Sequence, residues 1–243
     1  MAVNGGHMFR YTIFLQAAFC ASLLHAHEQS LIDIRNSVAR VYQRHKNVIS
    51  NAIEKASHKK TYGSLSPRNQ QFIYAILREV NLHEKISIKS HFTSCHGMIF
   101  GSILIINEKL FNELSDQEKR FVIAHEIMHY LLNHVGYKLC YASFYNANDD
   151  EYNTFSRLLE KEADLAAVQQ FSCLEGGILF FKRLKHTWGC SYYDKKNPQL
   201  QCIYDPEHPT FQERITYLEA LRTPQPRTLL SYIPFFNRYT TAH

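Results

Sequence analysis

The sequence predicts a mainly helical α+β fold in which a small β-sheet accompanies one buried helix. Apolar residues recur at helical spacing in several long segments, and they follow a strand pattern between residues 86 and 106. A further segment, residues 121–134, is apolar on every side, which is typical of a helix in the core. The chain has 243 residues, of which 45% are apolar and 20% charged, so it can form one sizeable core.

Two helices are expected before the strands. Residues 28–57 predict one long helix, because apolar residues recur at helical spacing and the basic residues between them suit a solvated face. A second helix is expected near residues 68–82, and Ser66 followed by Pro67 provides its start signal.

The pattern then changes from helix to strand. Residues 86–91 alternate between apolar and polar side chains, as a half-buried strand does. Residues 98–106, MIFGSILII, form a second strand candidate, in which Gly97 and Gly101 mark turn or bulge positions.

The buried helix is expected to begin at a capping box and to end at a glycine. Ser115 and Glu118 have capping-box spacing, and the box lies about ten residues before His125. Gly136 fits the end of the same helix. The residues that follow, 137–152, predict a loop or an insertion.

Three more helices are expected in the C-terminal part. They cover residues 152–171, residues 175–187 and a segment that begins near His208 and Pro209, with the proline in its first turn. Residues 188–207 contain Gly, Asn, Pro and two Cys residues, and they predict a long loop before the last helix.

The N-terminal segment resembles a secretory signal. Arg10 precedes a short apolar run from Tyr11 to Leu24, and small residues that suit cleavage follow near Ala26. The run is too short to span a bilayer comfortably. We therefore expect export to a periplasm or out of the cell, with a retained membrane anchor or a first core helix as the alternatives.

The cysteines add one weak expectation. No two of the six have Cys-x-x-Cys spacing, which argues against a zinc site made of cysteines. In an oxidising compartment Cys190 and Cys202 could pair, although the pairing of cysteines cannot be deduced from sequence alone.

His125, Glu126 and His129 form the pattern His-Glu-x-x-His inside the buried segment. Two helical histidines four residues apart lie on one face and can share one metal ion. Glu126 lies about 100° round the helix from His125, so it can reach a water on the metal without being a ligand. Zinc takes imidazole nitrogen readily and keeps one position open in catalytic sites. We expect one zinc ion rather than a metal-free polar cluster, because buried charge must be paired or bound to a metal.

A third ligand is expected later in the chain, but spacing alone does not identify it. Glu160 and Asp164 lie four residues apart, and the face of Glu160 also carries small residues that would let two helices approach closely. The helical arrangement does not exclude Glu162, and a solvated acidic pair explains Glu160 and Asp164 equally well.

Several motifs, taken in order, resemble a known family. ILIINEKLFNEL precedes FVIAHEIMH, EKEAD follows at residues 160–164, and HPTFQER follows at residues 208–214. From about Ile86 to Leu221 the chain resembles the zinc metallopeptidases that include the HtpX-type heat-shock proteases and the CAAX prenyl endopeptidases, metallopeptidase family forty-eight. The resemblance implies a gluzincin-like zincin domain with Glu160 as the third zinc ligand.

The resemblance also implies roles for three residues around the metal. Asp164 would hold a ligating histidine by its other ring nitrogen. His208 would donate to the oxyanion that forms during attack, and Arg214 would brace a carboxylate such as Glu160 or Asp164. Without the resemblance, His208 and Arg214 would be a helix-start residue and a surface charge. The chain lacks the transmembrane helices of the better-known members, so it looks closer to the small exported ones.

These motifs predict a zinc-dependent metalloendopeptidase that hydrolyses peptide bonds of protein substrates, in protein quality control outside the cytoplasm. Glu126 would be the general base that later returns a proton to the leaving amine. The alternative is a zinc-stabilised chaperone-like or binding module with little peptidase activity, which would use the same ligands.

The expected partners are protein or peptide substrates, and membrane association through the N-terminal segment is the alternative contact. A net charge of +5 without a dense basic block gives no reason to expect nucleic acid. The expected organisation is a signal peptide or anchor at residues 1–26, a metallopeptidase domain at residues 27–223 and a C-terminal tail at residues 224–243.

Overall fold

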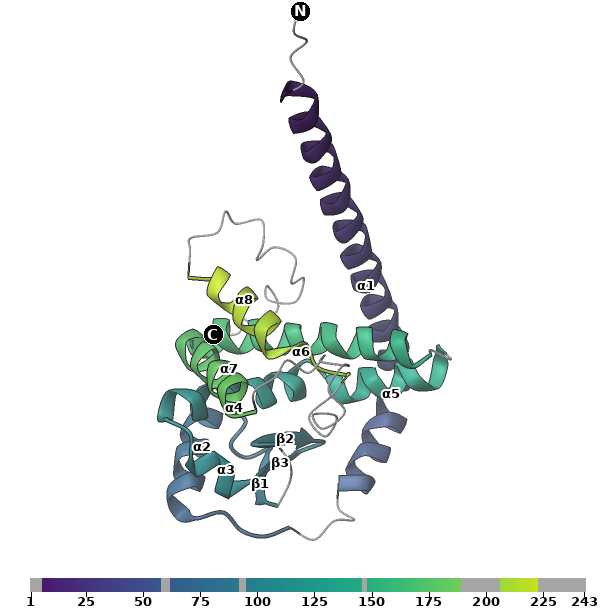
Figure 1. Cartoon of the computed structure of the whole chain (residues 1–243). Coiled ribbons are helices and arrows are strands. Elements are labelled where there is room, and N and C mark those ends of the chain that lie inside the picture. The colour runs from purple at the N-terminus through teal and green to yellow at the C-terminus, as the bar shows by residue number, and fades with distance from the viewer. Residues whose placement is uncertain (1–5, 58–61, 92–94, 146–147, 189–205, 223–243) are drawn as a thin grey trace, which may run out of the picture.

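The computed structural model describes residues 6–57, 62–91, 95–145, 148–188 and 206–222, with the backbone alone for residues 6–29, 57 and 188 (Figure 1). Its elements in chain order are α1 (Gly6–Ser57), α2 (Pro67–Glu79), β1 (Ser87–Ser90), β2 (Gly97–Phe100), β3 (Ile103–Ile106), α3 (Glu108–Asn112), α4 (Asp116–Leu131), α5 (His134–Phe144), α6 (Asp149–Phe171), α7 (Leu174–Trp188) and α8 (Phe211–Ala220). The predicted mainly helical α+β class with a small sheet is confirmed.

The sheet has three strands in the order β1-β3-β2, with β1 parallel and β2 antiparallel to β3. The prediction of one strand over residues 98–106 is wrong, because the chain turns back at Gly101, whose φ is 59°. Glycine adopts this left-handed conformation without steric cost, so the segment forms a hairpin. The turn leaves β2 at an edge of the sheet.

Helix α4 forms the centre of the fold. It packs against β2 on one side and against α6 and α7 on others, and Figure 1 shows α6 passing above it. The predicted capping box is present, since Ser115 accepts from the backbone of Glu118 and the Glu118 side chain accepts from the backbone of Ser115. The helix buries apolar side chains of its own on several sides, among them Phe121, Ile123 and Ile127.

The segment after α4 is a helix, and the prediction of a loop over residues 137–152 is wrong. Helix α5 buries Tyr137, Cys140 and Tyr141, which recur at helical spacing. Gly136 does not end α4. Asn133, whose φ is 59°, makes the left-handed turn, and Gly136 lies inside α5.

The C-terminal helices match the predicted segments but differ at their starts. Helix α6 begins at Asp149 behind an Asn148 cap, three residues earlier than predicted. Helix α8 begins at Phe211 behind a Thr210 cap, so His208 lies before the helix rather than at its start. Thr210 can cap the helix because its hydroxyl accepts from the N–H of the third helical residue.

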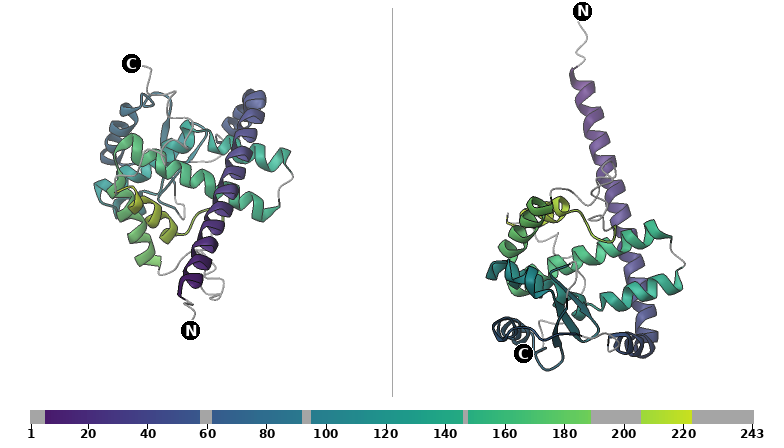
Figure 2. Two further views of the ribbon diagram at one scale, coloured as in Figure 1. Left: turned by 90° about the horizontal axis from the view of Figure 1, so that it is seen from above. Right: turned by 60° about the horizontal axis from the view of Figure 1, so that its bottom comes forward.

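Helix α1 is longer than predicted and runs past the body of the protein. Its N-terminal half extends away from the other elements in Figure 1 and in the right-hand view of Figure 2, whereas its C-terminal half packs against α5. Val38 and Tyr42 make that contact and are buried. The predicted 28–57 helix is therefore present, and its backbone continues without a break through the segment predicted as a signal.

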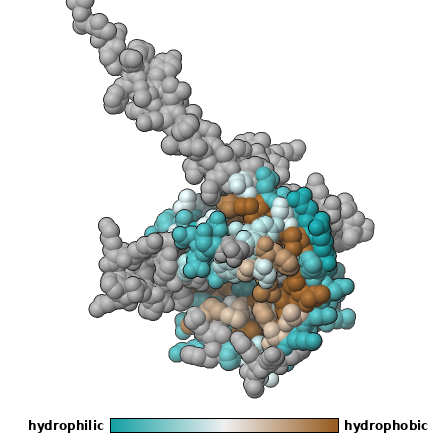
Figure 3. Space-filling model, turned by 90° about the vertical axis from the view of Figure 1, so that its right-hand side faces the viewer, coloured by the Kyte–Doolittle hydropathy of each residue, from teal (hydrophilic) through white to brown (hydrophobic). Residues whose placement is uncertain are grey.

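The face formed by α1 and α5 carries apolar residues between polar ones (Figure 3). Among the side chains of these two helices that the structure describes, Val48, Leu139 and Phe144 are the most exposed large apolar ones. No helix within the described residues is long and apolar enough to cross a membrane.

Two expectations fall on residues outside the described ranges. Cys190 and Cys202 lie within residues 189–205, as does most of the predicted long loop. The predicted tail lies within residues 223–243.

Candidate metal centre

Helix α4 supplies three of the predicted site residues within little more than one turn. His125 and His129 share one face and are each 8% exposed. Glu126 follows His125 on a neighbouring face and is half-buried. Because the other sides of α4 are packed in the core, the two imidazoles project from a rigid support.

Helix α6 brings Glu160 to these histidines. Glu160 is 2% exposed, and Ser156, Ala163 and Ala167 on the same face are fully buried. These small side chains leave room for α6 to pack on α4, as their pattern in the sequence suggested.

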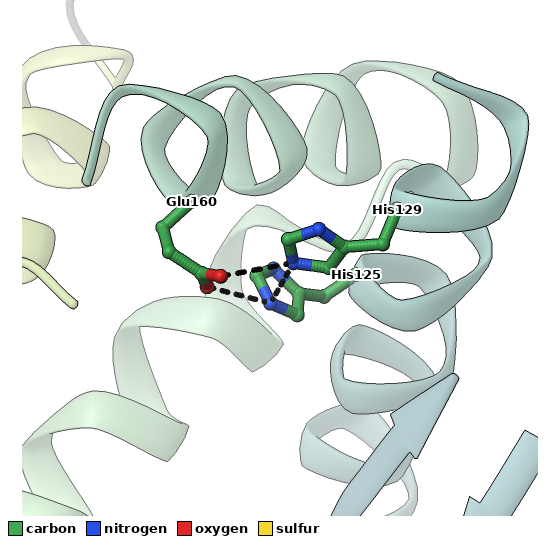
Figure 4. A group of neighbouring side chains, drawn as sticks. All are labelled: His125, His129 and Glu160. Carbon is green, nitrogen blue, oxygen red and sulfur yellow. Dashed lines mark hydrogen bonds and ion pairs between the residues drawn. The ribbon is translucent and has the colours of Figure 1, made fainter. Parts of the chain in front are cut away.

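The three side chains converge on one point (Figure 4). His125 Nε2 lies 3.0 Å from His129 Nε2 and 3.3 Å from Glu160 Oε2. His129 Nε2 lies 3.4 Å from Glu160 Oε1. Within the part of the chain that the structure describes, these residues offer three ligand atoms within 4.8 Å of one another.

A zinc ion fits this arrangement. Bonds from zinc to nitrogen or oxygen are about 2.0–2.2 Å long, so a tetrahedral site places its ligand atoms about 3.3–3.6 Å apart. The separations between the His125, His129 and Glu160 atoms lie within a few tenths of an ångström of that range. Glu160 Oε2 is buried and forms no hydrogen bond among the described residues, as expected of an atom whose partner is a cation.

Glu126 lies outside the ligand cluster, beside the edge strand. Its Oε2 accepts a hydrogen bond of 3.0 Å from the backbone N–H of Ile99 in β2. It lines the same pocket as His125. The carboxylate therefore lies beside the candidate ligands without being one of them.

Asp164 supports His125 from behind. Its Oδ1 lies 2.8 Å from His125 Nδ1, which leaves His125 Nε2 facing the metal centre. Arg214 binds both oxygens of Asp164, at 2.7 Å and 2.5 Å, and the hydroxyl of Tyr217 also donates to Asp164. The predicted bracing by Arg214 is thus directed mainly at Asp164, and its Nη1 lies 3.8 Å from Glu160.

The buried charges favour a cation at this centre. Burial alone lowers the pKa of His125, but the nearby Asp164 and Glu160 carboxylates outweigh it and raise that pKa to about 10. Burial raises the pKa of Asp164, but Arg214 and His125 bring it down to about 2. The pKa of Glu160 is held well below its usual range against burial, chiefly by His208 and His129. Two buried carboxylates therefore stay ionised and attract a proton or a metal ion.

His208 reaches the centre from the segment before α8. Its Nε2 lies 3.4 Å from Glu160 Oε2, and its side chain is 33% exposed, facing the pocket that His125 and Glu126 line. The structure thus brings all seven predicted site residues together, whereas Glu162, the other candidate for third ligand, turns away and pairs with Arg35.

Sequence reasoning missed three residues near the ligands. Tyr217 follows Arg214 by one helical turn and shares its face, a signal that was available. Lys138, whose Nζ lies 3.7 Å from Glu160 Oε1, fell in the segment predicted to be a loop. His134 was missed because it lies five residues after His129, off the face that a continuous helix would present.

Two pockets flank the centre along the edge strand. The smaller, of about 120 Å³, lies on the His125 side and is lined by Gly97 of β2 and by aromatic side chains such as Phe180. The larger, of about 520 Å³, lies on the His129 side and is lined by Ile99 of β2. Each of the two candidate histidine ligands therefore lines one of these pockets.

Comparison with known proteins gives one match. The family model of the IrrE N-terminal-like domain, peptidase M78, matches residues 81–192. A search of curated proteins finds no match to this chain. The match supports a metallopeptidase-like domain, and the region that it covers includes His125, Glu126, His129 and Glu160. It gives no support to the HtpX-type or CAAX family, and residues on α1 and α8 lie outside it.

Proposed function

We propose that this protein is a zinc-dependent endopeptidase that hydrolyses peptide bonds of protein substrates. The observation that carries the proposal is the convergence of His125, His129 and Glu160 at separations that suit zinc, with Glu126 beside them. The match to a metallopeptidase-like family supports the same assignment.

The chemistry divides between the metal and the side chains around it. A bound zinc would supply a Lewis acid that lowers the pKa of water and polarises a carbonyl. Glu126 is placed to take a proton from the attacking water and to return it to the leaving amine. His208, on the pocket side of Glu160, is placed to donate to the oxygen of the carbonyl as negative charge develops there.

The edge strand gives the substrate a place to bind. The backbone N–H of Ile99 points away from β3, toward Glu126, so β2 presents backbone groups beside the metal centre. An extended peptide can add to such an edge. The pocket lined by Phe180 and Phe211 would suit an apolar side chain of that peptide.

The place of action is part of the proposal too. The basic start at Arg10 and the apolar run from Tyr11 to Leu24 support export and a role in protein quality control outside the cytoplasm. N-terminal sequencing of the mature protein should then begin between about residues 23 and 28. Recovery of the intact segment in a membrane fraction would favour an anchor instead.

Metal content and turnover test the central claim. The purified full chain should hold one zinc ion and should cleave denatured casein, and a chelator should stop cleavage until zinc is restored. Glu126→Gln should keep the zinc and the fold but lose nearly all turnover, because an amide cannot carry the proton. Glu84→Gln makes the same chemical change at an exposed position and should cleave like the wild type.

The results separate catalysis from metal binding. Glu160→Gln should weaken zinc binding if Glu160 is the third ligand. Cleavage by Glu126→Gln at the wild-type rate would rule out the proposed role of Glu126. A wild-type protein that holds zinc and cleaves nothing would instead be a zinc-stabilised chaperone-like or binding module.

A further inference from the structure

A second buried histidine lies behind His129. His134 is fully buried, and its Nδ1 lies 2.9 Å from Nδ1 of His129. The two rings meet nearly edge to face, with an interplanar angle of 77°. His134 is not among the three residues whose ligand atoms cluster, so its position behind His129 needs another explanation.

The contact between the rings fixes where the protons lie. Two imidazole nitrogens at this distance share one proton, so one donates and the other accepts. His129 turns its Nε2 toward the metal centre, and a nitrogen that binds a metal carries no proton. Neutral His129 must then carry its proton on Nδ1 and donate it to Nδ1 of His134. His134 in turn carries its own proton on Nε2.

Glu162 is the charged group that faces this second nitrogen. Its Oε2 lies 3.5 Å from Nε2 of His134, which is buried and makes no hydrogen bond among the described residues. Arg35 holds Glu162 with two hydrogen bonds, from Nε at 3.2 Å and from Nη2 at 2.7 Å. Arg35 is itself 5% exposed, so this is a buried, oriented pair rather than a surface ion pair.

Helix α1 therefore contributes residues that support the metal centre, although it lies far from the ligands in the sequence. Arg35 lies on α1, 127 residues before Glu162 and outside the matched region. The same helix holds the turn that presents His134, because the hydroxyl of Tyr42 donates to Asn133 at 3.1 Å.

We propose that His134 is a positioning residue for the candidate metal ligand His129, and that Arg35 of α1 holds it in place through Glu162. His134 accepts the Nδ1 proton of His129 and so keeps Nε2 of His129 free and aimed at the metal. The proposal rests on the metal-binding part of the proposed function and is independent of peptide hydrolysis.

Zinc affinity of the full chain tests the role of His134. His134→Leu should weaken zinc binding by about 10- to 100-fold, measured by competition with a chelating dye, which is the usual scale for losing a partner of a ligating histidine. His134→Asn places an amide oxygen near the position of Nδ1 and should restore most of the affinity. His186→Leu removes an exposed histidine from α7 and should bind zinc like the wild type.

The role of Arg35 has its own matched pair of variants. Arg35→Gln should weaken zinc binding in the same direction as His134→Leu, but by less, because Glu162 and His134 remain. Arg40→Gln removes an exposed arginine from the same helix, whose contact is a hydrogen bond to Ser37, and should leave zinc affinity unchanged. Circular dichroism of each zinc-free variant shows which of them keep the fold.

A measurement on the wild type avoids any loss of fold. In zinc-loaded protein labelled with ¹⁵N, His129 should carry its proton on Nδ1, and a coupling should be observed between Nδ1 of His129 and Nδ1 of His134 across the hydrogen bond. Absence of that coupling, or a proton on Nε2 of His129, would overturn the proposal.

The outcomes distinguish this inference from the proposed function. A wild-type chain that binds no zinc would defeat both. A folded His134→Leu variant with wild-type zinc affinity, in a protein that does bind zinc, would defeat the positioning role alone. Equal losses in His134→Leu and His134→Asn would show that a hydrogen-bond acceptor is not what His134 supplies, which would also overturn the proposal.

Discussion

The two candidate histidine ligands lie one turn apart on α4 but are supported in different ways. His125 meets a carboxylate directly, and that carboxylate, Asp164, is bound by Arg214 and Tyr217 of α8. His129 meets a second imidazole first, and its carboxylate and arginine come one residue further out, on α6 and α1.

The comparison shows two ways in which a buried carboxylate can act on a metal ligand, by direct contact or through a neutral imidazole. On the His125 side a buried negative charge touches the ligand and raises the pKa of His125 to about 10. On the His129 side the imidazole of His134 separates the ligand from the carboxylate of Glu162. This ring is neutral, because burial lowers the pKa of His134 to about 4 although Glu162 acts to raise it. We therefore expect the His125 side to carry more of the electrostatic energy and the His129 side to act mainly through orientation.

The largest effect should come from Asp164→Asn. The change leaves the buried Arg214 without its ionic partner, and breaking a buried pair in this way costs about 3–5 kcal/mol. Glu162→Gln makes the equivalent change on the His129 side and should cost less, because the Glu162 side chain is 12% exposed and can keep some water. Urea unfolding of the zinc-free proteins measures both. If both variants lost the same free energy of unfolding, the His125 side would not carry more electrostatic energy than the His129 side.

His208→Ala tests the His125 side through catalysis. If His208 donates to the developing oxyanion, its loss should lower kcat by about 10²-fold while the zinc content stays the same. Steady-state cleavage of a fluorogenic peptide, with metal analysis of the same sample, gives both quantities. An undiminished kcat would leave His208 as part of the structure only.

Acid should act on the His125 side in a defined pH window. The pKa of Asp164 is lowered from 3.8 to about 2 in the folded protein, so its ionised form stabilises the fold above about pH 4. That contribution, about 2 kcal/mol, should be lost as the pH falls from about 4 toward 2. Urea unfolding at several pH values measures the slope, which Asp164→Asn should flatten. An unchanged slope in the variant would assign the acid sensitivity to other groups.

Gly136→Ala should change the stability of the protein least, and it should act only on the His129 side. A Cβ at Gly136 would lie 2.3 Å from the ring of Tyr42, so the ring must move. Overpacking of this kind costs about 1–3 kcal/mol, and the better helix propensity of Ala returns about 1 kcal/mol. Thermal unfolding should show a net loss of about 1 kcal/mol, with Ser143→Ala on the exposed face of α5 as the control. A Gly136→Ala variant more stable than the wild type would mean that the Tyr42 ring on α1 can move without loss of stability.

Helical spacing predicted that His125 and His129 share one face, whereas the roles of Glu160 and Asp164 followed only from the resemblance of their motif, since spacing alone left Glu162 open. His125, His129, Glu160 and Asp164 lie in two motifs whose members are three or four residues apart, and a helix places such residues on one face. The capping box at Ser115 could be predicted for the same reason, since it depends on contacts within one turn.

The His129 side could not be predicted in this way. On a continuous helix His134 would lie about 140° away from His129, and only the left-handed turn at Asn133 brings it back. Arg35 resembled the other basic residues of a solvated helix face, and its partner Glu162 is 127 residues away. A long-range pair leaves no periodic signal in a single sequence. Helix α5 was missed for a different reason: its buried residues recur at helical spacing, but they are Tyr and Cys rather than aliphatic residues.

The buried pair between α1 and α6 has a consequence for how related chains can diverge. Replacing Arg35 leaves Glu162 as an unpaired buried charge, and replacing Glu162 does the same to Arg35, so neither substitution is neutral alone. In relatives that keep α1, the two positions should therefore covary, being ionic together or apolar together. Arg40, exposed on the same helix, is free of this constraint and should drift independently.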